Sequence, residues 1–390
     1  MANKNLTNAK KAKNDEFYTQ FSDIQKEIES YLEFNPDTFK NKIIYCNCDD
    51  PFESNFFRYF VLNFKRLGLK RLITTSYKPS PVANTQLGLF GDDLTLPLVK
   101  GRPKITANKF IINDVGDVNG DGSFTLEDIA KQLKANKNNE WTPLEEDGDF
   151  RSVECVELLK QSDIVVTNPP FSLFREYITQ LFDHKKLFLI IGSLNAITYK
   201  EIFPMIKANK LWLGPSISSG DREFVVPHYI FKEIGNWRTD KNGIHYARVM
   251  GVRWFTNLDH GRRHQPIPLM TEVDVIKFST NKVFEKYDNY NAVEVPFVKN
   301  IPSDFTGIMG VPISFLDKYN PDQFEIVGMC ENEDLYKQKT KVYTSEECKQ
   351  AYLDKFGKKG IYDLNASGVV TRGGLREKVY QRVLIKHKKK

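Results

Sequence analysis

The sequence predicts an α/β fold in which helices cover both faces of a mostly parallel sheet. Short apolar runs at 42–48, 71–77 and 163–167 indicate buried strands, and the first and third end close to prolines. Segments in which apolar residues recur at helical spacing alternate with these runs. Strands that alternate with helices are joined by crossover connections, and such connections give parallel strands with both faces buried.

The first expected element is an amphipathic helix over 23–34, where apolar side chains recur three and four residues apart. The strand at 42–48 follows and ends at two aspartates and Pro51. Proline is tolerated in the first turn of a helix because its missing N–H would have no partner there. We therefore expect the next helix to begin at Pro51 and to present an inward aromatic face up to Gly68.

The second half of the predicted sheet consists of the strand at 163–167, a helix over 171–182 and a strand at 187–191. Beyond about Gly214 the pattern changes to short aromatic and β-branched runs separated by Gly, Pro, Asn and Asp. Such runs indicate hairpins at the rim of the sheet, followed by a smaller and less regular region.

The length and composition limit the class of protein. A chain of 390 residues predicts two domains, which we place at 1–260 and 261–390. With 41% hydrophobic and 27% charged residues, the composition is typical of a soluble globular protein. The apolar runs are too short to cross a bilayer and the lysine-rich N-terminus lacks the apolar stretch of a secretory signal, so we expect a cytoplasmic protein.

The cysteines and the net charge carry weaker information. The five cysteines lack the CxxC spacing of zinc sites, so we expect reduced thiols and no metal among the site residues. The net charge of +6 is modest but suits a polyanionic partner. Lysines gather at both ends of the chain, where they serve either as phosphate contacts or as solvated tails.

The candidate catalytic loop is Asn168-Pro169-Pro170-Phe171, which follows a predicted buried strand. Ligands of open α/β sheets bind beyond the carboxyl ends of the strands. The two prolines fix the backbone, so the Asn168 amide and the carbonyl between the prolines become preset acceptors. An exocyclic amine on a nucleobase becomes more nucleophilic when its hydrogens are accepted, and Phe171 can stack on the base. The loop therefore predicts chemistry on a planar amino group.

On the basis of this loop, the chain resembles the N6-adenine DNA methyltransferases. Among these enzymes, it is most similar to the group typified by the EcoRI modification enzyme. The resemblance covers most of the chain and is carried by 15–19, 48–54, 147–152 and 167–174. It implies the class I methyltransferase fold, S-adenosylmethionine as methyl donor, and a target-recognition region at 261–390 beyond a catalytic domain at 1–260. It further implies a monomer that rotates one adenine out of duplex DNA and methylates its N6 without a covalent enzyme intermediate.

The resemblance also implies which residues bind the methyl donor. Phe17, Tyr18 and Thr19 match the family's N-terminal motif, expected near the methionine end of the ligand. Asp49 and Asp50 match the acidic end of the first strand, expected to meet the amino group of the ligand.

Two further segments complete the expected site. Asp149 and Phe150 match residues that contact the adenine moiety, the carboxylate by accepting from its amino group and the ring by packing on its face. Pro51 and Phe52 extend the first loop, which departs from most class I methyltransferases because it lacks their Gly-x-Gly. The tetrapeptide beginning at Asn168 matches the catalytic motif itself. A cognate restriction endonuclease, acting without direct contact, is a further expected partner.

A calcium-loop pattern supports an alternative of another class. Asp117, Asn119, Asp121 and Asp128 stand at positions one, three, five and twelve, with glycine at six. Position twelve is aspartate instead of the longer glutamate, and Asp-Gly and Asn-Gly pairs also form ordinary turns. This leaves open a calcium-stabilised nucleic-acid-binding module without catalysis, which calorimetry with S-adenosylmethionine and calcium would distinguish.

Two other questions stay open at this stage. The same loop chemistry would serve methylation of cytosine N4 or of an RNA or protein amine, although asparagine at its head favours adenine. His260, Arg262, Arg263 and His264 follow an aromatic strand and form either a DNA contact or a solvated loop.

Overall fold

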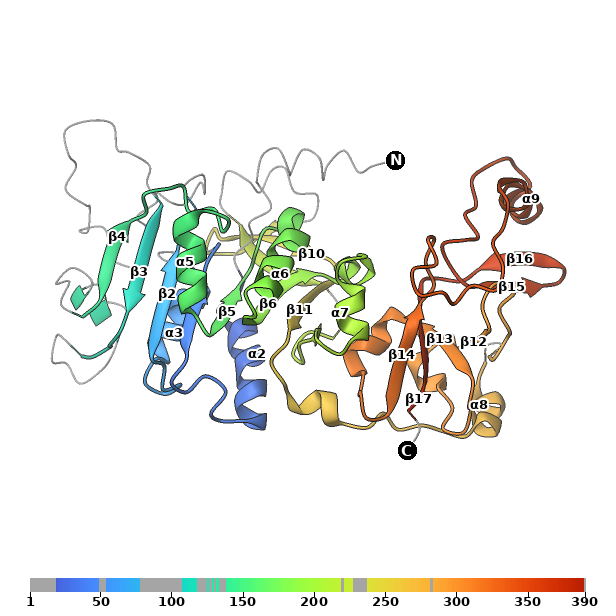
Figure 1. The fold of residues 1–390 in the computed structure, drawn as a ribbon, viewed down its shortest axis with the longest axis horizontal. Coiled ribbons are helices and arrows are strands. Elements are labelled where there is room, and N and C mark those ends of the chain that lie inside the picture. The colour runs from blue at the N-terminus through green and yellow to red at the C-terminus, as the bar shows by residue number, and fades with distance from the viewer. Residues whose placement is uncertain are drawn as a thin grey trace. The chain divides into compact units, whose positions relative to one another are not determined.

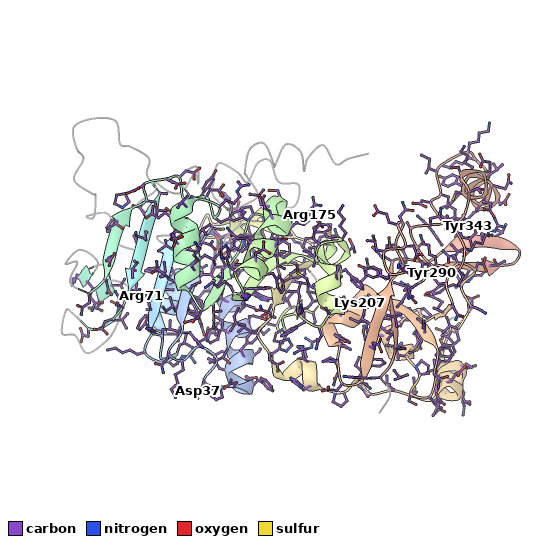
Figure 2. All side chains as sticks on the ribbon, viewed as in Figure 1. Asp37, Arg71, Arg175, Lys207, Tyr290 and Tyr343 are labelled. Carbon is purple, nitrogen blue, oxygen red and sulfur yellow. The ribbon has the colours of Figure 1, made fainter. Side chains whose placement is uncertain are left out.

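The computed structural model describes residues 19–48, 54–77, 107–117, 125, 128–129, 131–132, 138–218, 221–226, 237–280 and 283–388. The chain forms two compact units, one of Met1–Ile206 with Lys210–His260 and one of Lys207–Asn209 with Gly261–Lys390 (Figure 1). Of the residues labelled in Figure 2, Asp37, Arg71 and Arg175 belong to the first unit, and Lys207, Tyr290 and Tyr343 to the second.

The first unit contains an eight-stranded sheet in the order β4-β3-β2-β1-β5-β6-β11-β7. Its strands are β1 Ile43–Cys46, β2 Arg71–Thr75, β3 Asn108–Ile112, β4 Glu140–Pro143, β5 Ile164–Thr167, β6 Leu187–Ser193, β7 Trp212–Leu213 and β11 Val252–Thr256. The four central strands β2, β1, β5 and β6 are parallel, while β3 and β11 run antiparallel to both of their neighbours. Strands β4 and β7 therefore run in the same direction as the four central strands, which confirms the predicted mostly parallel sheet.

Helices cover both faces of this sheet. The helices in the described part of the first unit are α2 Phe21–Phe34, α3 Asn55–Leu62, α5 Val153–Gln161, α6 Phe174–Asp183 and α7 Phe203–Lys207, with 3-10 turns η1 Phe171–Leu173 and η2 Leu194–Thr198. Successive strand residues point to opposite faces. On one face Ile164 packs with α2 and α3 in the main core, and on the other Phe188 meets Phe182 of α6, their ring centroids 5.4 Å apart.

The predicted helix boundaries were wrong at the first strand-to-helix turn. The helix α3 begins at Asn55 and not at Pro51, because the Ser54 hydroxyl accepts from the N–H groups of the next turn and caps it there. Pro51 itself lies outside the described residues. The strand before it ends at Cys46 and not at Cys48, whose φ of 70° turns the chain out of the extended conformation. The aromatic helix also ends earlier than expected, at Leu62.

The hairpins expected beyond Gly214 are present. Strands β8 Arg222–Val226, β9 Trp237–Thr239 and β10 His245–Val249 form a three-stranded antiparallel sheet in the order β8-β10-β9. The chain then turns at Gly251, which has a φ of 65°, and returns to the large sheet as β11. Only glycine adopts this backbone conformation without steric cost.

The second unit is built on a smaller sheet in the order β12-β13-β17-β14. Its elements are α8 Glu272–Phe278, β12 Ala292–Glu294, β13 Ile308–Pro312, β14 Phe324–Met329, α9 Ser345–Phe356, β15 Val369–Arg372, β16 Leu375–Lys378 and β17 Arg382–His387, with 3-10 turns η4 Gly261–His264, η5 Val298–Asn300 and η6 Ile313–Lys318. The strands β15 and β16 form a separate hairpin. Nowhere in the described part of the chain is a helix long and apolar enough to span a membrane.

Candidate active site

The predicted site loops leave the sheet at one edge. Strands β2, β1 and β5 are parallel neighbours, and their registers pair Cys46 with Thr74 and Tyr45 with Val165. Their carboxyl ends therefore lie side by side, which is where an open α/β sheet binds ligands.

A buried asparagine joins the first loop to the catalytic loop. Asn47, only 2% exposed, directly follows β1. Its backbone carbonyl accepts from the Thr167 hydroxyl at the end of β5, and its side-chain Oδ1 accepts from the Tyr177 hydroxyl on α6. The chain leaving β1 and the chain leaving β5 are thus held together by hydrogen bonds in the interior, where such bonds are strongest.

The catalytic tetrapeptide is positioned as a rigid turn. Asn168 is 6% exposed and Pro169 is buried, while Pro170 and Phe171 are half-buried. The Pro170 carbonyl accepts from the Leu173 N–H at 2.9 Å, which starts η1. No hydrogen bond from a described residue reaches the Pro169 carbonyl, the one between the two prolines. Phe171 packs partly against the main core.

Gly148 holds the segment of Asp149 and Phe150 at the end of β2. Its φ of 77° is the left-handed conformation, and a Cβ added there would overlap the Ser76 carbonyl oxygen and lie 3.0 Å from the Ala107 Cβ. Glycine is therefore needed both for its backbone conformation and for this close approach. Gly148 was not predicted as a site residue, although Asp-Gly is a recognised turn signal.

Phe150 connects the same segment to the buried tyrosine. Its ring is almost fully buried and meets the Tyr177 ring edge to face, with centroids 5.0 Å apart. The contacts from Phe150 through Tyr177 to Asn47 join the segment 147–152 to the residue that precedes 48–54, and Asn47 also binds Thr167, the first residue of 167–174. Tyr177 was not predicted as a site residue, because aromatic residues at helical spacing ordinarily indicate packing on the sheet.

Asp149 is held by a neighbouring arginine. Arg151 donates to its carboxylate from Nε at 2.8 Å and from Nη2 at 2.7 Å, and also donates to Glu176 from Nη1. This bidentate pair fixes the orientation of the carboxylate. The Asp149 bonds raise the pKa of Arg151 above its ordinary value, so the guanidinium stays charged.

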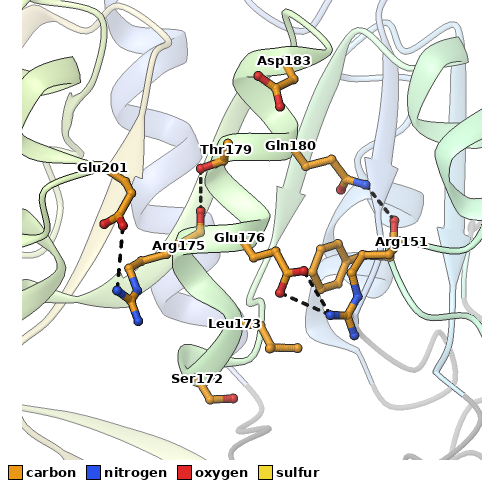
Figure 3. Close-up of a pocket in the computed structure, with 10 residues that line it drawn as sticks. Arg151, Ser172, Leu173, Arg175, Glu176, Thr179, Gln180, Asp183 and Glu201 are labelled. Carbon is orange, nitrogen blue, oxygen red and sulfur yellow. Dashed lines mark hydrogen bonds and ion pairs between the residues drawn. The ribbon is translucent and has the colours of Figure 1, made fainter.

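An open cavity of about 610 Å³ runs along α6 beside the catalytic loop (Figure 3). Figure 3 shows charged side chains from the helix and its neighbours around it, with Arg151 paired to Glu176 and Arg175 to Glu201. Its lining is Phe150, Arg151, Ser172, Leu173, Arg175, Glu176, Thr179, Gln180, Asp183 and Glu201. It begins at η1 and does not include Asn168, so we do not assign it to the methyl donor.

Thr19 is the described member of the N-terminal motif. It is buried, and its carbonyl accepts from Asn55 Nδ2 at 2.8 Å, which places it at the start of α3 beyond the first loop. Its hydroxyl is buried without a hydrogen bond to a described residue. The other predicted contacts of the first two motifs, Phe17, Tyr18, Asp49, Asp50, Pro51 and Phe52, lie outside the described residues.

The described residues test only part of the calcium-loop pattern and of the basic cluster at 260–264. Most of the calcium pattern lies outside the described residues, and Asp128 accepts from the Thr125 backbone and hydroxyl as an ordinary local turn does. Within the described ranges no cluster of three His, Cys, Asp or Glu side chains could hold a metal ion. In the basic cluster, His260 and Arg263 are buried, with bonds to Leu213 and Asn209, so a DNA contact there does not include them.

Tyr177→Phe should destabilise the protein without removing any side chain from the predicted reaction centre. The loss of its hydroxyl leaves the buried Asn47 Oδ1 without this donor, which costs about 1–3 kcal/mol. A thermal unfolding scan should show a melting temperature several degrees lower. Tyr199→Phe is the control, because Tyr199 is half-buried with Arg175 over its ring and its hydroxyl makes no hydrogen bond to a described residue. Equal melting temperatures for the two variants would contradict the role of Asn47.

Comparisons with known proteins identify the family of this chain. The family model described as "Adenine-specific methyltransferase EcoRI" matches residues 5–388. Among curated proteins, Type II methyltransferase M.EcoRI of Escherichia coli is 42% identical over 83% of this chain and 89% of its own length. Type II methyltransferases M.MpnI of Mycoplasma pneumoniae and M.MgeORF184P of Mycoplasma genitalium are 35% and 37% identical, each over 83% of this chain and over 85% and 86% of their own lengths. No solved structure matches the chain.

Proposed function

The chain belongs to the EcoRI family of adenine-specific methyltransferases, and from this premise we propose that it methylates adenine N6 at specific sites in duplex DNA, with S-adenosylmethionine as methyl donor. The observation that carries the proposal is the loop Asn168–Phe171, placed at the same sheet edge as Asn47 and Gly148. The family disfavours the cytosine N4 and calcium-module alternatives.

The catalytic loop would act as an acceptor for the adenine amino group. With the base rotated out of the duplex, Asn168 Oδ1 and the Pro169 carbonyl accept its two hydrogens, and Phe171 stacks on the ring. These bonds draw the nitrogen lone pair out of conjugation, so that it can attack. When bound, S-adenosylmethionine would supply an electrophilic methyl group, and the electron pair of the broken carbon–sulfur bond would stay on sulfur in S-adenosylhomocysteine, the leaving group. A proton leaves the methylated nitrogen for water, and no bond forms between enzyme and base.

The proposed methyl-donor site combines the three remaining segments. Phe17, Tyr18 and Thr19 would contact the methionine end, and the buried Thr19 hydroxyl supports this because a ligand can satisfy it. Asp49 and Asp50 would bind the amino group of the ligand, as the opposite charges favour. We include Pro51 and Phe52 as flanking contacts of this loop.

Asp149 and Phe150 would bind the adenine moiety of the methyl donor. The position of Gly148 against Ser76 supports this, since it fixes the segment beside the end of β2. The Phe150 ring already packs on Tyr177, so its contact with a ligand would use the remaining edge or face.

The methyl donor should protect Cys48 from alkylation, because Cys48 precedes Asp49 and is half-buried. Cys348, equally half-buried in the second unit, is the matched control. Burial raises the pKa of Cys155, and that of Cys330 to about 12, so these buried thiols should react slowly in either case. Mass spectrometry after brief iodoacetamide treatment should show S-adenosylmethionine slowing modification of Cys48 alone. Equal rates at Cys48 with and without the ligand would argue against this loop.

The function is tested by incubating the purified chain with S-adenosylmethionine and plasmid DNA from a host without adenine methylation. Mass spectrometry of the released nucleosides should find N6-methyladenine and no N4-methylcytosine. Sequencing that detects modified bases should then place the methyl groups within one short recognition sequence. Absence of methylation, or methylation of cytosine, would refute the proposal.

The remaining assignments follow from this function. We propose that residues 1–260 catalyse the transfer and that 261–390 recognise the target sequence. Since DNA in a bacterial cell lies in the cytoplasm, the enzyme would work there, as a monomer. A restriction endonuclease of the same recognition sequence, blocked by the methyl group and not bound to the enzyme, is the expected partner.

A further inference from the structure

The second unit contains an open cavity of about 820 Å³ with an unusual set of side chains. Four cations and two carboxylates line it together with aromatic and small residues: Thr280, Glu294, Pro296, Phe297, Lys355, Tyr362, Arg372, Glu377, Lys378, Val379, Tyr380 and Arg382. The lining comes from β12, α9, the β15–β16 hairpin and the start of β17. All of its lining residues belong to the second unit, whereas the candidate active site belongs to the first.

Arg382 is fixed in the wall of this cavity by a buried carboxylate. The residue is only 7% exposed. Its Nε donates to both Glu294 oxygens at 3.1 Å, and its Nη2 donates to Oε1 at 2.6 Å. Tyr287 also donates its hydroxyl to Glu294. Arg382 Nη1 makes no hydrogen bond to a described residue, so its two N–H groups are already oriented for a ligand.

Lys378 is the second available cation of the cavity, because no carboxylate in the described part of the chain pairs with it. The other two are engaged, because Arg372 donates from Nε to Glu285 at 2.9 Å and Lys355 lies 3.4 Å from Glu377. The Lys378 ammonium instead lies 5.2 Å from the centre of the Tyr362 ring. Tyr380, two residues further, is 88% exposed at the cavity. A fixed guanidinium, a lysine and an exposed aromatic ring thus face the same space.

The charge distribution along the chain indicates what this cavity binds. Residues 261–390 contain 22 Lys and Arg against 17 Asp and Glu, whereas 1–260 contain 34 against 33. Most of the net positive charge is therefore in the unit that has the cavity. A polyanion is the partner that such an excess favours. The proposed substrate, duplex DNA, is a polyanion.

We propose that this cavity is a DNA contact site, in which Arg382 Nη1 and Lys378 Nζ donate to acceptor atoms of the duplex. Both phosphate oxygens and the O6 and N7 atoms of guanine offer such acceptors to an arginine fork. The inference rests on the proposed function, because it names residues with which the enzyme holds that substrate. Tyr380 would pack against the sugar and phosphate at the rim.

The test measures binding of a 30-base-pair duplex that contains the mapped methylation site, by fluorescence anisotropy at several salt concentrations. Lys378→Ala should weaken binding several-fold and lower the slope of log affinity against log salt by about one. Lys386→Ala is the matched control, since Lys386 lies on the same strand as Arg382 but outside the cavity, paired with Glu325. It should leave both quantities unchanged.

Arg382→Lys tests the fixed guanidinium while it keeps a positive charge beside the buried Glu294. If Nη1 contacts guanine, methylation should become tolerant of substitution at one base pair, with a loss of discrimination of about tenfold or more. If it contacts phosphate, affinity should fall equally for all duplexes. Either result supports the site.

Unchanged affinity, salt slope and base preference in both Lys378→Ala and Arg382→Lys would overturn the inference. If Arg382→Lys does not fold, as judged by its melting temperature and S-adenosylmethionine binding, Lys378→Ala decides alone. Failure of the proposed function is a separate result, because the unaltered protein would then neither bind nor methylate the duplex.

Discussion

Asn168→Ala is expected to lower kcat for methyl transfer by at least about 100-fold while the dissociation constant of S-adenosylmethionine stays within about twofold. The Asn168 amide would contact the reacting amino group, so its removal costs the transition state more than the ground state of the methyl-donor complex. Single-turnover methylation of duplex DNA measures the rate, and isothermal titration calorimetry measures methyl-donor binding. Asn168 is 6% exposed, so correct folding of the variant needs its own check by thermal unfolding.

Asn168→Asp is the matched variant, because a carboxylate keeps an acceptor at the same place. It should retain more activity than the alanine variant. Equal losses of rate and of methyl-donor affinity in Asn168→Ala would contradict the assignment, since they would indicate damage to the whole pocket. Identical activities of the two variants would also contradict it.

Gly148→Ala is expected to destabilise the protein by more than about 2 kcal/mol and to weaken S-adenosylmethionine binding. A left-handed alanine alone costs about 1–2 kcal/mol. In addition, its Cβ would overlap the Ser76 carbonyl oxygen, so the segment of Asp149 and Phe150 must move away from β2. Urea unfolding measures the first effect and calorimetry the second.

Gly243→Ala separates strain from steric overlap. Gly243 has a φ of 80°, close to that of Gly148, but a Cβ there would meet nothing within 4 Å. This variant should show only the backbone cost and bind the methyl donor normally. If Gly148→Ala were no less stable than Gly243→Ala, the close approach to β2 would be unimportant and the proposed position of Asp149 would lose its support.

The sequence predicted the central sheet well because its strands are buried on both faces. A buried parallel strand such as β5 appears in the sequence as a continuous apolar run. The strands alternate with helices along the chain because crossover connections join parallel strands. The element ends were less predictable. A proline in the first turn and a serine cap are both common helix starts, and only the structure shows that Ser54 caps α3.

The catalytic loop could be predicted because its chemistry is local. Asn168 and the two prolines are consecutive, so their rigidity and their acceptors can be read from four residues. The bonds of Asn47 join residues 120 and 130 positions apart, and no short pattern specifies such pairs. The same reason explains why the sheet of the second unit was not predicted, since β17 pairs with β13 from more than 60 residues earlier in the chain.

The bonds of Asn47 also have a thermodynamic consequence for the affinities of the two substrates. Its carbonyl and its amide are both fixed by elements that carry the catalytic loop, while its own chain continues directly into the proposed methyl-donor loop. A shift of either loop on ligand binding therefore changes the free energy of the other. Linkage then requires reciprocity. The factor by which the bound cosubstrate raises the affinity for DNA must equal the factor by which bound DNA raises the affinity for the cosubstrate.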